Sequence, residues 1–260
     1  KTLAGAVDHL LCIHDMEVPY YTPFGLETTV IGNPAISRSQ RGNGEAFRAA
    51  QGFGEEEKII LVLPGSRSSE IKRVAPALVD AARQIKEKMP AVNVVFAPAA
   101  NVAAQFGDMF PDVPNWALII GANANRYDAM AAADLALACS GTVTTELAMQ
   151  GAPMIVAYRT GWITWSLARG LLYQKTHITL LNIVSDDEEI VPEFVQTRQK
   201  PELISAKALE WLVSPEKLAT QKSAQQAALD RMREGDRDAA EIAAGVVLEE
   251  ASRRRAGLLA

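Results

Sequence analysis

The sequence has 260 residues, 48% of them hydrophobic and 22% charged, which suits one large or two moderate folded domains and excludes a mainly disordered chain. Its formal net charge of −5 lacks the basic excess that nucleic-acid backbones attract, so we expect no nucleic-acid partner. No apolar run approaches the roughly 20 residues of a membrane-spanning helix, and the first residues lack a signal-peptide pattern, so we expect a cytoplasmic protein.

The predicted elements begin with two strands, at 10–13 and 29–31, followed by a polar stretch over 37–44 that we predict as a linker. Cys12 and Cys139 each lie in an apolar strand-like run, which predicts buried thiols rather than a disulfide or a metal pair. Beyond the linker, apolar β-branched runs alternate with stretches long enough for a helix, which is typical of buried parallel strands. The runs lie at 58–63, 92–96, 116–120, 134–138 and 154–158.

Helices are predicted between and after these strands. The stretch 74–89 places its apolar residues on one face and is followed by Pro90, which predicts a helix that ends there. The alternation of strands and helices predicts a doubly wound α/β domain over about 45–200. The other predicted helices lie at 126–133, 143–150, 202–212, 215–232 and 237–254.

The first candidate site is the turn that follows the first strand of this domain and opens a helix. Gly65 and Ser66 offer backbone N–H groups and a hydroxyl to an anion, and Arg67 can add a bidentate hydrogen bond to phosphate oxygens. The turn therefore suits a diphosphate. The alternative is an ordinary turn in which Ser68 or Ser69 caps the helix and Glu70 lies in its first turn.

The second candidate site is a similar turn after the strand at 134–138. Gly141 lets a ligand approach the backbone, Ser140 and Thr142 offer hydroxyls, and Glu146 lies one helical turn further along the same face. A carboxylate at this position can accept both hydroxyls of a ribose. Two such turns at the carboxyl ends of neighbouring strands predict a nucleotide site, although two plain capped helices remain the alternative. The sequence lacks the glycine motifs of dinucleotide and P-loop sites.

The histidines do not indicate a metal site. His9, His14 and His177 do not fall at ligand spacing. His14 with Asp15 and Glu17 offers metal-ligating residue types, but the polarity of a loop also explains them. We therefore predict no metal and no cofactor.

Several motifs, in this order along the chain, resemble those of the lipid-A-disaccharide synthase family of glycosyltransferases. The match extends from about Asp8 to the last helices. The motifs are LPGSR at 63–67 with EIKR at 70–73, SGT at 140–142 with Glu146, PMIVAYR at 153–159, TW at 164–165 with LAR at 167–169, LNIV at 181–184 and VPEFVQ at 191–196.

The resemblance implies an α/β fold of the GT-B type, in which a Rossmann-like doubly wound parallel sheet is joined by a partial second Rossmann-like domain. Residues 1–36 would end the N-terminal acceptor domain, 37–44 would link the domains, and 45–232 would form the donor-binding domain. A C-terminal helix in 233–260 would pack back on the N-terminal domain or on a partner subunit of a homodimer. A strand pattern begins almost at once after Lys1, so we expect that an N-terminal part is missing and that it contains the general base. The catalytic residues are therefore unknown.

The implied reaction moves 2,3-diacylglucosamine from UDP-2,3-diacylglucosamine to 2,3-diacylglucosamine 1-phosphate, giving the β(1→6) lipid A disaccharide and UDP. The transfer is inverting and independent of metal, so helix N-termini and donors must stabilise the departing diphosphate. The resemblance implies nucleotide and diphosphate contacts from Gly65, Ser66, Arg67, Ser140, Gly141, Thr142 and Glu146. It also implies donor-sugar contacts from Asn182, Gln196, Tyr158 and Arg159.

Acylated substrates imply a peripheral protein on the inner face of the inner membrane. The apolar stretch 162–173 would face lipid or an acyl chain, or else pack in the core or at a dimer contact. The segment 185–189 departs from the Gly-Arg-Glu of the family and either tunes recognition or forms a surface loop. Two other functions stay open. One is a non-catalytic UDP-sugar-binding module, because half a cleft cannot hold the acceptor, and the other is a different GT-B enzyme that uses UDP-sugars.

Overall fold

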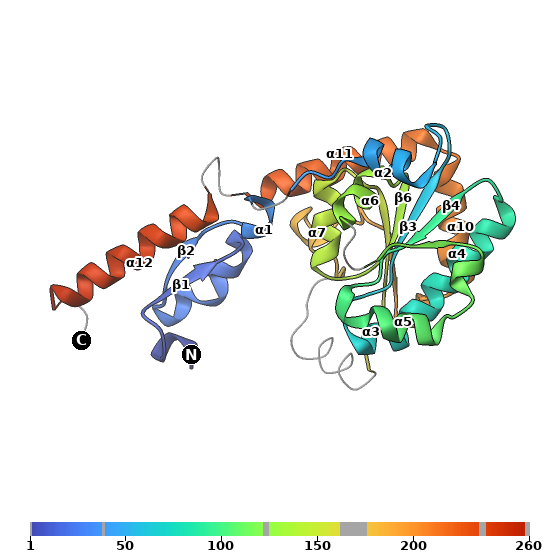
Figure 1. Ribbon diagram of the computed structural model, residues 1–260. Coiled ribbons are helices and arrows are strands. Elements are labelled where there is room, and N and C mark those ends of the chain that lie inside the picture. The colour runs from blue at the N-terminus through green and yellow to red at the C-terminus, as the bar shows by residue number, and fades with distance from the viewer. Residues whose placement is uncertain (1, 38–39, 122–124, 162–175, 234–237, 258–260) are drawn as a thin grey trace. The chain divides into compact units, whose positions relative to one another are not determined.

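The computed structural model describes residues 2–37, 40–121, 125–161, 176–233 and 238–257 (Figure 1). The chain divides into two compact units. The smaller unit combines residues 1–39 with 229–260, and the larger unit comprises residues 40–228.

The smaller unit is built around two parallel strands, β1 (His9–Cys12) and β2 (Glu27–Val30). Its helices are the short α1 (Pro34–Ser37) and the long α12 (Ala239–Arg255), which contact each other. Side-chain hydrogen bonds also join α12 to the strands, as between Arg253 and Glu27. Both predicted strands of this region are therefore present, with bounds shifted by one or two residues.

The larger unit contains a six-stranded, fully parallel sheet with the strand order β5-β4-β3-β6-β7-β8. The first strand of this unit, β3, lies in the middle of the sheet, and the order reverses between β3 and β6. Open α/β sheets bind ligands outside the carboxyl ends of the strands at such a reversal. The strands are β3 (Ile59–Leu63), β4 (Asn93–Phe96), β5 (Leu118–Ile119), β6 (Leu135–Cys139), β7 (Met154–Tyr158) and β8 (Glu193–Val195).

Helices cover both faces of this sheet (Figure 1). On one face, Ile60 and Val62 of β3 pack in a buried cluster with Leu78 of α4 and Ile204 of α10. The other helices include the contacting pair α2 and α6. In chain order, the helices are α2 (Gly44–Gln51), α3 (Ser68–Arg73), α4 (Ala75–Lys88), α5 (Ala103–Met109), α6 (Arg126–Ala132), α7 (Thr142–Met149), α9 (Leu180–Val184), α10 (Pro201–Leu212) and α11 (Pro215–Arg231).

All five predicted strands are present, although β5 is short and only half-buried, and both cysteines are buried free thiols as predicted. Strand β8, which has only three residues and includes a glutamate, was not predicted from the sequence. Helix α2 was not predicted either, and it begins at Gly44, the last residue of the stretch predicted as a linker. Gly42 and Gly44 in that stretch run close to α6. A Cβ built on Gly42 would lie only 2.0 Å from the carbonyl oxygen of Tyr127, so the approach leaves no room for a side chain. Asn43 then caps α2 by accepting a hydrogen bond from the Ala46 N–H.

Among the described residues, no helix is both long enough and apolar enough to cross a membrane.

Candidate functional site

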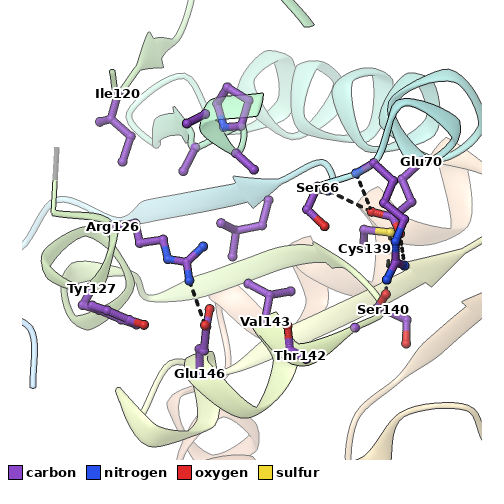
Figure 2. Close-up of a pocket in the computed structure, with 18 of the residues that line it drawn as sticks. Ser66, Glu70, Ile120, Arg126, Tyr127, Cys139, Ser140, Thr142, Val143 and Glu146 are labelled. Carbon is purple, nitrogen blue, oxygen red and sulfur yellow. Dashed lines mark hydrogen bonds and ion pairs between the residues drawn. The ribbon is translucent and has the colours of Figure 1, made fainter. Parts of the chain in front are cut away.

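A pocket of about 470 Å³ opens at the carboxyl ends of β3, β4, β5 and β6, where the strand order reverses. Its volume lies in the range of small-molecule sites, which is about 300–1,000 Å³. Both turns singled out in the sequence contribute to its wall (Figure 2). The polar lining residues are Ser66, Arg67, Glu70, Asn125, Arg126, Tyr127, Ser140, Thr142 and Glu146, and Gly65 and Gly141 also line it.

The turn after β6 leads directly into the N-terminus of α7. The N-cap residue is Gly141, which has no side chain to cap the helix, and its φ of 162° is ordinary extended backbone. The first N–H groups of a helix have no partner within the helix and carry partial positive charge. The hydroxyl of Thr144 donates to the Gly141 carbonyl and so orients the turn. This helix start therefore has no side-chain cap and lies at the pocket wall, where Gly141, Thr142 and Val143 line the pocket. The anion site stays a prediction.

The turn after β3 is arranged differently from the prediction. The carboxylate of Glu70 in α3 is buried, and its Oε2 accepts hydrogen bonds from the N–H groups of Ser66 at 2.8 Å and Arg67 at 3.2 Å. Its Oε1 accepts a third bond from Arg67 Nη1 at 2.9 Å. Of the N–H groups that the sequence offered to a diphosphate, that of Ser66 is thus bound by a carboxylate of the same chain. The Ser66 hydroxyl and the exposed Arg67 side chain remain as groups for a ligand.

A glutamate three residues after the N-cap is a known sequence signal for this arrangement. The N-cap is Arg67, and α3 begins at Ser68. Neither Ser68 nor Ser69 is the cap, so that detail of the alternative prediction is wrong. Glu70 lies in the first turn of α3, as that alternative predicts.

The part of the pocket wall that α6 and α7 form carries an ion pair that was not predicted from the sequence. Arg126, the first residue of α6, donates from Nη2 to Oε1 of Glu146 in α7 at 2.8 Å (Figure 2). Burial raises the pKa of the Glu146 carboxyl, while the Arg126 charge and the Tyr127 hydroxyl oppose that rise. Asn125 caps α6 by accepting from the Tyr127 N–H. The sequence spacing could not identify Arg126 as the partner of Glu146, because the pair depends on α6 and α7 lying side by side.

The four residues assigned to the donor sugar lie outside the lining of this pocket. Tyr158 ends β7 and is half-buried, and the next residue, Arg159, is exposed. Gln196 follows β8 with a φ of 53°, in the left-handed region. Its Oε1 accepts from the Thr160 N–H at 3.3 Å, and its buried Nε2 has no partner among the described residues.

Asn182 is fully buried, and both ends of its amide are engaged. Its Nδ2 donates to the Val191 carbonyl at 2.8 Å and to Glu193 Oε1 at 2.9 Å, and its Oδ1 accepts from the Val191 N–H at 2.8 Å. Glu193 also accepts from the N–H of Thr179, which precedes α9. Asn182 therefore holds the chain that leads into β8.

The segment 185–189 also forms hydrogen bonds with other parts of the chain. Asp187, at a φ of 64°, accepts hydrogen bonds from the N–H groups of Thr176 at 2.7 Å and His177 at 3.0 Å. These bonds hold the pKa of the Asp187 carboxyl well below its usual range, the Thr176 N–H being the largest cause. The neighbouring apolar stretch 162–173 lies outside the described residues.

Among the residues that the structure describes, one group of metal-ligating side chains occurs, and it lies in the smaller unit. Atoms of His9, Glu27 and Glu250 lie within 4.8 Å of one another. The guanidinium of Arg253 donates to both carboxylates, at 2.9 Å and 3.0 Å. His9 also forms a hydrogen bond with Thr29. A positive charge of the protein is therefore already paired with both carboxylates, and the group joins α12 to β1 and β2. Spacing in the sequence gave no signal of this cluster, because its members come from three elements.

Comparison with known proteins matches residues 1–247 to the family of lipid-A-disaccharide synthetases. The lipid-A-disaccharide synthase of Paramagnetospirillum magneticum is 34% identical over 254 residues, which cover 96% of this chain and 64% of the relative. The synthase of Ruegeria pomeroyi is 32% identical over 257 residues, which cover 95% of this chain and 63% of the relative. The chain thus spans somewhat less than two thirds of the length of these relatives.

Solved structures with low sequence identity share the fold. HepE of Anabaena in complex with UDP has a TM-score of 0.54 at 15% identity, covering 95% of this chain and 64% of that one. WaaG, a glycosyltransferase involved in lipopolysaccharide biosynthesis, has a TM-score of 0.50 at 15% identity, covering 84% and 57%. The larger unit accordingly has the Rossmann-like fold of GT-B glycosyltransferases. With the family match over nearly the whole chain, the conclusion is that this chain belongs to the lipid-A-disaccharide synthetase family.

Proposed function

We propose that the chain carries the donor-binding part of a lipid-A-disaccharide synthase. In this proposal, it binds UDP-2,3-diacylglucosamine, and the enzyme transfers the sugar to 2,3-diacylglucosamine 1-phosphate with release of UDP. The observation that carries the proposal is the pocket at the reversal of strand order, which combines an uncapped helix start with a half-buried carboxylate. The helix start suits the diphosphate of a nucleoside diphosphate, and the carboxylate suits its ribose hydroxyls.

The diphosphate is assigned to the turn between β6 and α7. The N–H groups at the start of α7 would donate to its oxygens, with the hydroxyls of Ser140 and Thr142 beside them. Arg67 faces the same pocket from the opposite turn, and its exposed guanidinium would bind the outer phosphate. As the glycosidic bond to the donor breaks, negative charge grows on the departing UDP, and these fixed donors stabilise it.

The ribose is assigned to Glu146, whose carboxylate has the capacity to accept both hydroxyls. For the donor sugar, Gln196 is the strongest of the four candidates, because its buried Nε2 has no partner among the described residues. Asn182 is assigned an indirect role, since its amide is fully engaged in holding the chain before β8. Tyr158 and Arg159 remain candidates at the carboxyl end of β7.

The acceptor and the general base are assigned to parts of the synthase that the relatives have and this chain does not span. An inverting transfer needs a base to take the proton of the acceptor 6-hydroxyl while that oxygen attacks the anomeric carbon. The acyl chains of both substrates favour work at a membrane surface. In cells, we propose the cytoplasmic face of the inner membrane as that surface.

The first experiment is a calorimetric titration of the chain with UDP, with ADP as comparator. We expect UDP to bind more tightly than ADP, and Glu146→Gln to weaken UDP binding about tenfold, as for a lost hydrogen bond to a charged group. Glu87→Gln is the matched control, because Glu87 is exposed on α4, away from the pocket. A folded chain that binds neither nucleotide, or binds both equally, would contradict the proposal.

The preferred donor sugar distinguishes the proposed synthase from an enzyme that uses another UDP-sugar. We expect UDP-2,3-diacylglucosamine to compete with UDP more effectively than UDP-N-acetylglucosamine does. The opposite order would favour an enzyme with a non-acylated substrate.

A further inference from the structure

The ion pair between Arg126 and Glu146 is the feature of the pocket that the proposed nucleotide contacts leave unexplained. It joins the first turn of α6 to α7, and its two charged groups meet at the pocket wall, 2.8 Å apart (Figure 2). An exposed pair of this kind usually contributes little to stability. Here the Glu146 side chain is only 16% exposed, against 48% for Arg126. The arginine therefore acts on a carboxylate that is largely withdrawn from water.

Burial and charge have opposite effects on this carboxylate. Burial is the largest influence on the pKa of Glu146 and raises it, whereas the Arg126 guanidinium and the Tyr127 hydroxyl lower it. Both of these groups come from α6. The other charged residues in the pocket, Arg67 and Glu70, are paired with each other at the turn after β3. Arg126 is thus the positive charge that favours the ionised form of Glu146.

The geometry also fixes the direction of the carboxylate. The Arg126 guanidinium lies over the Tyr127 ring, 5.4 Å from its centroid, so it is held against α6. It bonds one oxygen of Glu146, Oε1. A carboxylate offers about four acceptor sites, so this bond leaves capacity for two hydroxyl donors.

We infer that Arg126 is a positioning residue: its guanidinium holds the Glu146 carboxylate oriented so that this carboxylate accepts the two ribose hydroxyls of UDP. The inference rests on the proposed function of the pocket. It predicts that Arg126 contributes to affinity through the ribose and makes no contact of its own with the diphosphate. A guanidinium that bound phosphate directly would contribute equally whether or not the sugar carries hydroxyls.

The test compares UDP with 2′,3′-dideoxy-UDP, which has the same base and diphosphate but no ribose hydroxyls. Calorimetric titration of the full chain gives the ratio of the two dissociation constants for each variant. In the unsubstituted chain we expect UDP to bind at least about tenfold more tightly than the dideoxy nucleotide, since hydrogen bonds to a charged acceptor are lost with the hydroxyls. Arg126→Met should reduce this preference to about twofold or less, while the affinity for dideoxy-UDP changes by less than about twofold.

Two further variants make the comparison specific. Arg126→Lys keeps the positive charge and should restore most of the preference for UDP. Arg83→Met is the matched control, because Arg83 is also a half-exposed arginine that pairs with a carboxylate and lies over an aromatic ring, but outside the pocket. It should leave both dissociation constants unchanged. Circular dichroism checks the folding of each variant, and Arg126→Gln replaces Arg126→Met in the comparison if the latter unfolds.

The dependence on pH gives an independent readout. Removal of Arg126 should let Glu146 take up a proton at a higher pH, so the preference for UDP should disappear at a higher pH in Arg126→Met than in the unsubstituted chain. Both nucleotides carry the same diphosphate, so its own ionisation cancels in the ratio.

The outcomes separate this inference from the function on which it rests. An unsubstituted chain that fails to bind UDP overturns the proposed function, and the inference with it. If UDP binds but Arg126→Met weakens UDP and dideoxy-UDP by the same factor, the arginine contacts the diphosphate and the inference alone is overturned. A preference for UDP that Arg126→Met leaves unchanged overturns it as well.

Discussion

Gly65 and Gly141 occupy equivalent places in the two turns of the pocket, yet the same substitution should affect them in opposite ways. Gly65 has a φ of +128°, and a Cβ built on it would lie 2.6 Å from the Cβ of Glu70. Gly141 has an extended φ of 162°, and a Cβ built on it would meet no atom within 4 Å. Only the first glycine is therefore required by the fold.

The expected magnitudes follow from these two geometries. A non-glycine residue held in a sparsely populated backbone region costs about 1–3 kcal/mol, and added bulk in a packed site costs a similar amount. Gly65→Ala should therefore lower the free energy of unfolding by about 3 kcal/mol. Gly141→Ala should leave it unchanged or raise it by up to about 1 kcal/mol, because alanine restricts the unfolded chain more than glycine does.

Urea denaturation followed by circular dichroism measures both free energies, and UDP titration of the same variants measures binding. Since Gly141 lines the pocket, its added methyl group should weaken UDP binding without loss of stability. Two results would refute the reasoning. One is a Gly65→Ala variant as stable as the unsubstituted chain, and the other is a Gly141→Ala variant that is destabilised by more than about 1 kcal/mol.

Two further predictions concern carboxylates outside the pocket. Asp134 accepts hydrogen bonds from the Ile59 N–H, Arg48 and Lys58 at 2.8–3.0 Å. Asp134→Asn should therefore lower the free energy of unfolding, measured by urea denaturation, by about 2 kcal/mol. A change under about 0.5 kcal/mol would show that these bonds are dispensable. Asp187 has a lowered pKa in the folded state, so its charged form stabilises the fold above the ordinary aspartate pKa of about 3.9, and that contribution is lost as the pH falls toward the folded-state value. The stability difference between Asp187→Asn and the unsubstituted chain should thus be full near neutral pH and shrink below about pH 4, whereas a difference independent of pH would contradict this assignment.

The strands of the larger unit could be predicted because their signal is local. In β3 and β6 every residue is apolar and every one is buried, so a short window of sequence suffices. The turns at their carboxyl ends could also be located, because parallel strands bring those ends to one edge. Contacts between elements distant in sequence were not predictable in the same way. The Arg126–Glu146 pair depends on α6 lying beside α7, and no spacing rule encodes that distance.

The same limit applies to buried polar side chains. Gln221 lies in the predicted helix 215–232, but its amide bonds the backbone N–H and carbonyl of Met154 in β7, which only the packed structure reveals. Glu70 is an instructive intermediate case. Its spacing from Arg67 is a recognised capping signal, yet the same residues suit a phosphate, and the sequence alone could not decide between the two.

The central position of β3 has a consequence for how the protein folds. Its pairing with β4 joins Ile60 to Val94, whereas its pairing with β6 joins Ile60 to Leu135, much farther along the chain. Closing the longer loop loses more chain entropy, and contacts of large sequence separation slow folding. We therefore expect β3, α4 and β4 to assemble before β6 docks. Because the pocket lies where β3 and β6 meet, nucleotide binding should appear only in the last stage of folding, and a nucleotide would stabilise the finished domain without assisting its earlier intermediates.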